Sequence, residues 1–505
     1  MRSRSALITT AFAASALGSN TYKPLVSSEK LQELVTLEDL LAGSQKLQDI
    51  ADAHGGNRAF GGGGHNATVD YLYDTLAALD GYYDVVKQPF TELYFAGSAR
   101  VSANGVAYDA NTMTYTPSGT VEGAPLVAVA NVGCDAADFP AGVEGNVALI
   151  SRGVCPFSQK ATNAKAAGAV AALIYNNVPG VISGTLGGPG DYAPVVGLSQ
   201  ETGQTLLAAL EAGDEVLVDV NIDAITEYRT NYNVIAETKQ GDKNNVLVLG
   251  GHSDSVPAGP GINDDGSGTI GVLNVAVALS HFSINNAVRF AFWGAEEFGK
   301  LGSYYYMKEL NGTFSNDPGA DAEVNKIRAY LNFDMIASPN YVYGIYDGDG
   351  NAFNLSGPAG SAQLEKDFED FYTSKGAAFV PAEFSGRSDY AAFIENGIPS
   401  GGLFTGAEVV KTEEEAALFG GQAGVAYDVN YHQPGDTVDN LALDAFLLNT
   451  QSIANSVAKY ALSFDSLPPV EPVKRRWAAD RAKLFSRSVH THSHSGPCGQ
   501  QPNLI

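Results

Sequence analysis

Apolar and polar positions alternate along residues 226–463 in an order that predicts strands separated by helices. Strand-like apolar runs occur at NNVLVLGG, NAVRFAFWGA and KIRAYLNFDMI, and helical periodicity occurs in GTIGVLNVAVALSHF and in the closing segment DNLALDAFLLNTQSIANSVAKYAL. This order predicts an α/β fold, a mixed and mostly parallel sheet sandwiched by helices. Ligands in such folds bind beyond the carboxyl ends of strands, so polar residues directly after each strand are candidates for a functional site.

The segment that precedes this region has a different pattern of apolar and polar residues. Short β-branched or apolar runs, together with the alanine-rich stretch KATNAKAAGAVAALIYNN, which we interpret as a helix, predict a small inserted α/β domain over residues 121–225. Residues 51–120 are assigned to the first part of the main domain, and residues 226–463 to the rest of it. Residues 17–50 are helical in pattern and could be a propeptide, and the proline-led, basic residues 464–505 are predicted to form a disordered tail.

The first 16 residues have the pattern of a secretory signal. Arg2 and Arg4 precede an apolar run too short to span a bilayer, and small residues suited to cleavage follow it. No later segment is long and apolar enough to be a membrane anchor, so we expect a secreted, extracellular monomer, with the vacuole as the alternative destination. The formal net charge of −26 argues against nucleic acid as a partner.

The cysteines and the glycosylation triplets agree with an exported protein. Of the three cysteines, Cys134 and Cys155 are candidates for a disulfide in an oxidising compartment, which leaves Cys498 as the odd thiol. Three candidate N-glycosylation sites are Asn66, Asn311 and Asn354.

Residues suited to bind metal follow the predicted strands at five places. They are His252, Asp264 with Asp265, Glu296 with Glu297, Asp334, and His432. Ionised carboxylates at the ends of apolar strands are costly unless they are paired or bound to metal, and here they recur after three successive strands. Two imidazoles with several carboxylates suit zinc. If one carboxylate bridges two ions, the other four ligands divide two per ion, and Asp264 is the best-placed bridge.

Two further acidic residues have candidate roles beside these ligands. Glu296 and Glu297 cannot both face one point from a regular strand, so the chain must turn there, which Gly294 permits. One carboxylate can then bind metal while its neighbour acts as general base. Asp254 lies two residues from His252, where it could orient the imidazole or simply cap a turn.

The inserted segment resembles the protease-associated domain. The resemblance is carried by Cys134, by DFP at residues 138–140, and by GNVALISRGVCPF and KAAGAVAALIYNN. It implies a disulfide between Cys134 and Cys155 and a role as a lid or in substrate access, without catalytic residues, although a passive spacer is the alternative.

The metal-ligand set resembles that of the co-catalytic dizinc aminopeptidases, the group containing aminopeptidase Y and the secreted leucine aminopeptidases. This resemblance implies the zinc exopeptidase fold with two Zn²⁺ per subunit. It implies that His252 and Asp334 bind one zinc ion, that Glu297 and His432 bind the other, and that Asp264 bridges them. Glu296 would then be the base for a water held between the ions.

The resemblance also implies roles for three residues that would contact the substrate. Tyr431 would donate a hydrogen bond to the tetrahedral intermediate, Arg387 in GRSDYAAF would contact the carboxylate side of the peptide, and Phe404 in GGLFTGAE would line the specificity pocket. The expected activity is removal of Leu or other apolar residues from peptides with free N-termini. A dizinc carboxypeptidase of the glutamate carboxypeptidase type and a catalytically inactive receptor-like protein are the alternatives.

Overall fold

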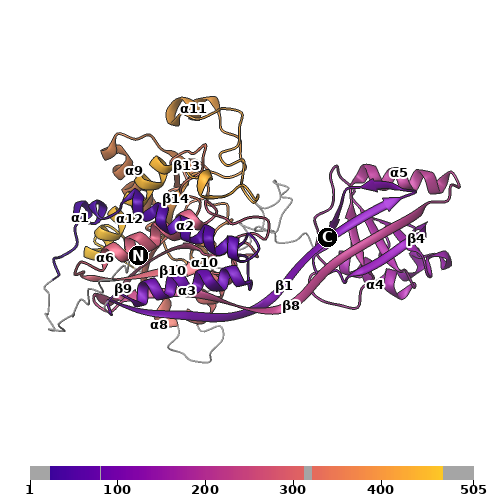
Figure 1. Cartoon of the computed structure of the whole chain (residues 1–505), viewed down its shortest axis with the longest axis horizontal. Coiled ribbons are helices and arrows are strands. Elements are labelled where there is room, and N and C mark those ends of the chain that lie inside the picture. Colours follow the sequence, from indigo (N-terminus) through magenta and orange to yellow (C-terminus); the bar gives the residue numbers. More distant parts are fainter. Residues whose placement is uncertain (1–22, 80, 312–320, 470–505) are drawn as a thin grey trace, which may run out of the picture.

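The computed structural model describes residues 23–79, 81–311 and 321–469 (Figure 1). The predicted signal peptide, residues 17–22 and most of the predicted tail, with Cys498, lie outside this part of the chain. Helices are α1 (Ser28–Glu33), α2 (Leu37–Ala53), α3 (Gly63–Ala77), α4 (Phe157–Ala166), α5 (Gln200–Glu211), α6 (Gly266–Leu279), α7 (Leu301–Leu310), α8 (Asp321–Val324), α9 (Ser361–Lys375), α10 (Tyr390–Glu395), α11 (Glu413–Phe419) and α12 (Leu443–Leu462). Strands are β1 (Tyr83–Ala103), β2 (Val106–Tyr108), β3 (Ala110–Thr112), β4 (Gly119–Ala128), β5 (Val147–Ser151), β6 (Ala171–Tyr175), β7 (Val195–Leu198), β8 (Leu217–Thr238), β9 (Asp242–His252), β10 (Asn286–Trp293), β11 (Ile327–Phe333), β12 (Gly344–Tyr346), β13 (Val380–Ala382) and β14 (Ser400–Phe404).

The main domain is built on a sheet in the order β13-β12-β14-β11-β9-β10-β8, with β1 paired to β8. Its centre, β14, β11, β9 and β10, is parallel, and the antiparallel pairings β12 with β14 and β8 with β10 flank that centre. The predicted mixed, mostly parallel sheet is therefore confirmed.

The alternation of side chains along the strands divides the apolar core between the two faces of the sheet. In β9, Leu247 and Leu249 face the core formed with α2, α6, α9 and α12, whereas Val246 and Val248 face the core formed with α7, α8 and α10. Both residues of each pair are fully buried. Such burial on both faces explains why the strand is a continuous apolar run.

The N-terminal helices are part of this core. Leu31 of α1 and Leu40 and Leu47 of α2 are fully buried in the cluster that contains α6 and α12. Thr36 caps α2 by accepting a hydrogen bond from the Asp39 N–H. Whether residues 17–50 are removed as a propeptide stays a prediction, but from Leu31 onward they pack as an integral layer of the main domain.

A two-stranded ribbon carries the inserted domain away from the main domain (Figure 1). Strands β1 and β8 pair antiparallel without a break from Tyr83–Thr238 to Ala103–Val218. We call the segment between them, residues 104–216, the insert. It contains the parallel strands β4, β5, β6 and β7, with β3 antiparallel to β7 and β4 antiparallel to β8. The predicted domain boundaries at residues 120/121 and 225/226 stay predictions, because the ribbon is continuous through both parts.

One predicted element of the insert is wrong. The alanine-rich stretch KATNAKAAGAVAALIYNN is predicted to be a single helix, but α4 ends at Ala166 and strand β6, fully buried from Ala171 to Ile174, begins at Ala171. Gly168, at φ +81°, provides the left-handed turn between them. A short apolar run such as AALIY fits a buried strand as well as a buried helix, so periodicity alone does not separate the two.

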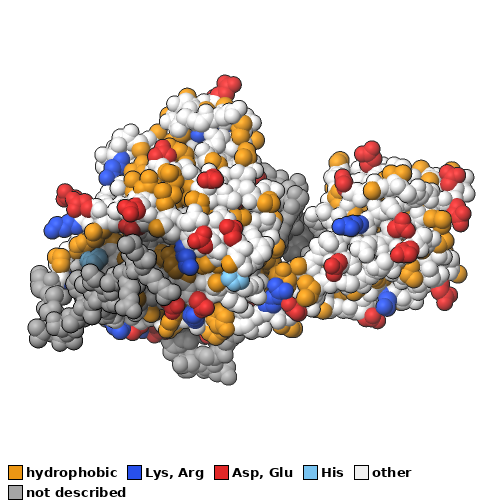
Figure 2. Space-filling view, viewed as in Figure 1, with side chains coloured by type: hydrophobic (Ala, Val, Ile, Leu, Met, Phe, Trp, Pro, Cys, Tyr) orange, Lys and Arg blue, Asp and Glu red, His pale blue; other side chains and the backbone are white. Residues whose placement is uncertain are grey.

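On the face seen in Figure 2, acidic side chains are scattered over both parts of the molecule. Of the predicted glycosylation sites, Asn66 and Asn354 are exposed and Asn311 is half-buried, and their modification stays a prediction. Among the described residues, no helix combines the length and apolar character needed to cross a bilayer.

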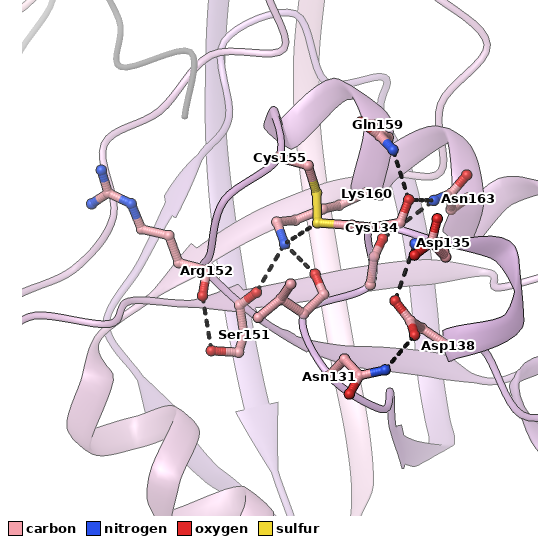
Figure 3. Close-up of a disulfide and its surroundings, with 12 residues drawn as sticks. Asn131, Cys134, Asp135, Asp138, Ser151, Arg152, Cys155, Gln159, Lys160 and Asn163 are labelled. Atoms are coloured by element: carbon pink, nitrogen blue, oxygen red, sulfur yellow. Dashed lines mark hydrogen bonds between the residues drawn. A yellow bond between two sulfur atoms is a disulfide. The ribbon is translucent and has the colours of Figure 1, made fainter.

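The insert contains the predicted disulfide between Cys134 and Cys155 (Figure 3). Beside it lies the fully buried Lys160, whose ammonium group donates to the carbonyl oxygens of Val132 and Ser151 and lies 4.0 Å from the Cys134 sulfur. Burial lowers the pKa of Lys160 to about 8, and Asp138 opposes this effect.

This lowered pKa predicts a pH-dependent contribution to stability. Between about pH 8 and pH 10.5 the unfolded chain keeps the Lys160 proton while the folded chain releases it, so this residue makes the protein more stable as pH rises across that window. We expect the difference in thermal midpoint between the wild type and Lys160→Met to shift in favour of the wild type from pH 8 to pH 10.5. Other titrating groups are common to both proteins and cancel, so a difference that is constant with pH would contradict the assignment.

Candidate metal centre

The predicted ligands meet at the carboxyl ends of the central strands. His252 is the last residue of β9, Glu296 and Glu297 follow β10, and Asp334 follows β11. Asp264 lies just ahead of α6, and His432 lies in the loop between α11 and α12. His252, Asp264, Glu296, Glu297 and Asp334 are all buried. Parallel strands thus bring residues from five separate segments to one edge of the sheet.

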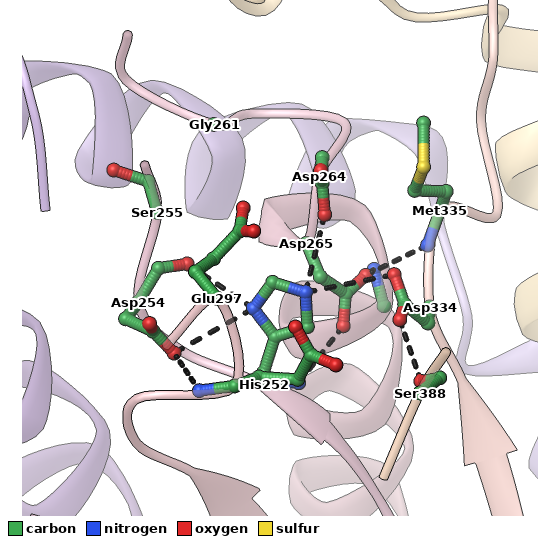
Figure 4. A network of polar contacts seen from close by, with 12 residues as sticks. His252, Asp254, Ser255, Gly261, Asp264, Asp265, Glu297, Asp334, Met335 and Ser388 are labelled. Carbon is green, nitrogen blue, oxygen red and sulfur yellow. Dashed lines mark hydrogen bonds and ion pairs between the residues drawn. The ribbon is translucent and has the colours of Figure 1, made fainter. Parts of the chain in front are cut away.

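Asp264 lies between two groups of these side chains. Its Oδ1 is 3.1 Å from His252 Nε2, which is in turn 3.6 Å from Asp334 Oδ1. Its Oδ2 is 3.1 Å from His432 Nε2, which is also 3.1 Å from Glu297 Oε2. Figure 4 shows His252 facing Asp264 and Asp334, with Asp254 on the other side of the imidazole. The two oxygens of one carboxylate therefore face two separate pairs of ligands.

The chemistry of this cluster fits zinc. Buried oxygens of Glu296 and Glu297 have no hydrogen-bond donor. Burial raises the pKa of Glu296 and of Glu297 above their ordinary values. Burial also disfavours the Asp264 anion, but hydrogen bonds with the imidazoles of His252 and His432 outweigh it and hold the Asp264 pKa below its ordinary value. Buried carboxylate oxygens without donors are stabilised by a cation, and two imidazoles with three carboxylates are the ligand types zinc takes in proteins.

Asp254 connects the first ligand to the predicted base. Its Oδ1 accepts a hydrogen bond from the backbone N–H of Glu296 at 3.0 Å and lies 3.7 Å from His252 Nδ1. The same imidazole nitrogen is 3.3 Å from the Asp254 carbonyl oxygen. Asp254 thus contacts the ring of His252 and also anchors the backbone that carries Glu296. This agrees with a positioning role more than with a simple turn cap.

The turn that separates Glu296 from Glu297 differs from the one expected. The residue with positive φ is Ala295, at +58°, and not Gly294. Gly294 is needed for space, because a Cβ there would lie 2.6 Å from the Tyr232 carbonyl oxygen. His432 and Met335, which follows Asp334, also have positive φ, at +57° and +54°. Such backbone is costly for residues other than glycine and is typical of functional sites.

Three buried residues that support the cluster were missed by sequence reasoning or given no role. Asp265 accepts hydrogen bonds from the N–H groups of His252, Gly268 and Met335, which joins the end of β9 to α6 and to the segment after β11. Asp436 accepts from the N–H groups of Asn263 and Asp264 at 2.8 and 3.0 Å. Burial, together with the nearby Asp428 carboxylate, raises the pKa of Asp436 to about 8. Only its place in HQPGDT, four residues after His432, hinted at this role.

Arg58 is the third of these residues and the principal cation of the region. It is fully buried, and its guanidinium donates to the carbonyl oxygens of Ser253, Pro260 and Gly261. Its charge interacts favourably with the carboxylates of Asp254, Asp264, Asp265 and Asp436. A single arginine in the glycine-rich segment between α2 and α3 therefore holds the loop between His252 and Asp264 and offsets part of its negative charge.

The three residues predicted to contact the substrate line one pocket. Tyr431, Arg387 and Phe404 line it together with His252, Asp264, Glu296 and Asp334. Tyr431 stacks on the His432 ring, with centroids 3.8 Å apart. The pocket is completed by Met335, Tyr346, Glu383, Ser385, Ser388, Tyr390 and Ala407. The structure therefore brings all predicted metal, catalytic and substrate-binding residues together.

Comparison with known proteins identifies the family. Residues 233–457 match the model of peptidase family M28, and residues 121–206 match the PA domain. The protein named "Probable leucine aminopeptidase 2" of Aspergillus fumigatus is 54% identical over 484 residues, which cover 94% of each chain. The chain belongs to peptidase family M28. It is a zinc-dependent aminopeptidase with a PA domain inserted in the peptidase domain.

Solved structures share this fold. An aminopeptidase from Aneurinibacillus sp. strain AM-1 is 26% identical, with a TM-score of 0.61 over 88% of this chain and 98% of that one. A zinc aminopeptidase from Bacillus subtilis is 23% identical, with a TM-score of 0.58 over 87% of this chain and 99% of that one, a likeness that bears on the fold alone.

The buried position of Arg58 predicts a large effect on stability. Arg58→Met should lower the free energy of unfolding by about 3 kcal/mol or more, because three carbonyl groups lose their donors and the carboxylates lose a cation. Denaturant unfolding of metal-free protein measures this. Lys46→Met, which removes one positive charge from the exposed side of α2, should change stability little. Equal denaturation midpoints for the two variants would show that Arg58 does not stabilise the fold in this way.

Proposed function

We propose that this chain is a secreted aminopeptidase with two zinc ions, which removes leucine and other apolar residues from peptides with a free N-terminus. The observation that carries the proposal is the position of Asp264, whose two oxygens face two separate pairs of ligands. His252 and Asp334 would hold one ion, Glu297 and His432 the other, and Asp264 both. The N-terminal signal pattern and the disulfide of the insert support export.

Zinc at these positions would supply a Lewis acid for the scissile carbonyl and would lower the pKa of a water molecule. Glu296 is the base that takes the proton of the attacking water and passes it to the leaving amine. Asp254 keeps Glu296 in place through its backbone N–H and faces the imidazole of His252. Tyr431, on the same pocket, donates a hydrogen bond to the oxygen that gains charge in the tetrahedral intermediate.

The preference for apolar side chains follows from the pocket wall. Met335, Tyr346, Tyr390 and Phe404 line the pocket beside the ligands, so an apolar side chain entering it would bury apolar surface. Leucine is also the residue in the printed names of the curated relatives.

Glu296→Gln tests the assignment of the base. The amide keeps the size of the side chain but cannot take up the water proton, so we expect kcat to fall by roughly 10²- to 10⁴-fold while zinc content and thermal midpoint stay near wild type. Glu297→Gln is the contrasting variant, because it should lose zinc as well as activity. A Glu296→Gln enzyme with wild-type kcat would rule out this residue as the base.

Removal and return of the metal tests the activity as a whole. We expect hydrolysis of a leucyl chromogenic amide by the purified protein, loss of hydrolysis after chelation, and recovery when zinc is restored, with two zinc ions per chain by elemental analysis. A dizinc carboxypeptidase would instead cleave N-acetylated dipeptides, which an aminopeptidase cannot accept. Cleavage of the blocked peptide and not of the free one would reverse the proposal.

A further inference from the structure

Arg387 is held by a carboxylate of its own chain. Its Nη1 donates to Glu408 Oε1 at 2.9 Å, and its Nη2 donates to Glu408 Oε2 at 3.3 Å. The two side chains are 34% exposed each, at the edge of the pocket that holds the metal ligands. Two parallel N–H donors on two carboxylate oxygens form the fork by which an arginine recognises any carboxylate. The Nη1 and Nη2 donors of Arg387 are therefore already paired with the carboxylate of Glu408.

The same guanidinium also contacts the catalytic pocket directly. Nη2 of Arg387 donates to the Tyr431 hydroxyl at 3.1 Å. Glu408 thus fixes the direction of an arginine whose other contact is the tyrosine that stacks on His432.

Backbone hydrogen bonds hold the residues on either side of Glu408. Glu408 lies between Ala407 and Val409, whose carbonyl oxygens accept hydrogen bonds from the N–H groups of Asp428 and Tyr427. On the opposite side of the ion pair, the loop of Arg387 is held by a hydrogen bond from the Gly386 N–H to the Tyr390 hydroxyl at 2.9 Å. The backbone beside each partner is therefore held by hydrogen bonds within the chain.

We propose that Glu408 is a specificity-determining residue that keeps Arg387 from selecting substrates by a carboxylate close to the scissile bond. A dipeptide carries such a carboxylate one residue after that bond, whereas a longer peptide has a neutral peptide group there. With Glu408 in place, a dipeptide carboxylate must displace an existing bidentate partner, so the site treats dipeptides and longer peptides alike. This inference rests on the proposed function, and it makes the enzyme suited to complete stepwise degradation of long peptides.

The test compares Leu-Leu, which has a free carboxylate, with Leu-Leu amide, which has none. In the zinc-loaded wild type and in Glu408→Gln we would measure kcat and KM for both. Glutamine keeps one acceptor oxygen but removes the negative charge and the second acceptor, so Arg387 regains a donor for the substrate carboxylate. We therefore expect the ratio of kcat/KM for the acid to that for the amide to rise by roughly three- to tenfold, through a lower KM for the acid. Glu408→Asp restores a carboxylate and should return the ratio toward wild type.

Two further variants separate this role from general effects. Glu414→Gln removes one negative charge from the exposed side of α11 and should leave the ratio unchanged. Arg387→Met combined with Glu408→Gln should abolish the gain, because the fork is then absent. A wild type that cleaves both substrates, with a ratio that Glu408→Gln does not change, overturns the role of Glu408 alone. A zinc-loaded wild type that cleaves neither overturns the proposed function, and this inference with it.

Discussion

The buried negative charge at the carboxyl edge of the sheet is the constraint on which the rest of the site depends. Carboxylates away from water are stable only where donors and cations surround them. The chain meets part of this need with Arg58, part with backbone N–H groups on Asp265 and Asp436, and part with imidazoles. Buried oxygens of Glu296 and Glu297 remain without donors, and Glu297 lies with Asp264 against the imidazole of His432. That residual need for positive charge is what zinc would satisfy.

The fold serves this requirement by placing short polar segments at the ends of strands whose centres are mostly apolar. Val246 to Leu249 pack on both faces of the sheet, which leaves the strand end as the place where polar side chains can gather. The left-handed residues at Ala295, Met335 and His432 redirect the chain directly at the ligands. Rigid strands therefore set the coarse position of each ligand, and a local turn sets its direction.

The parts of this arrangement that could be predicted from the sequence are those with a local pattern. The apolar runs predicted β9 and β10, and the helical period predicted α6. The position of His252 directly after an apolar run predicted that it lies at the carboxyl edge of the sheet with the other candidate ligands. The parts that could not be predicted depend on contacts between distant segments. Nothing near Arg58 indicates that its partners lie about 200 residues away, and nothing near Glu408 indicates that it faces Arg387. AALIY is short enough to fit either a helix or a strand, and the prediction of a helix there is wrong because the segment pairs with β5 and β7 on its two sides.

The continuous ribbon of β1 and β8 has a mechanical consequence. Domains joined by flexible linkers reorient independently, but here two hydrogen-bonded strands pass from the main domain into the insert without a gap. Rotation of the insert would have to twist or bend this ladder along its length, which spreads the deformation over many residues instead of a hinge. The insert is therefore tied to the sheet beside β10 through a ladder of backbone hydrogen bonds and not through a single strand of flexible chain.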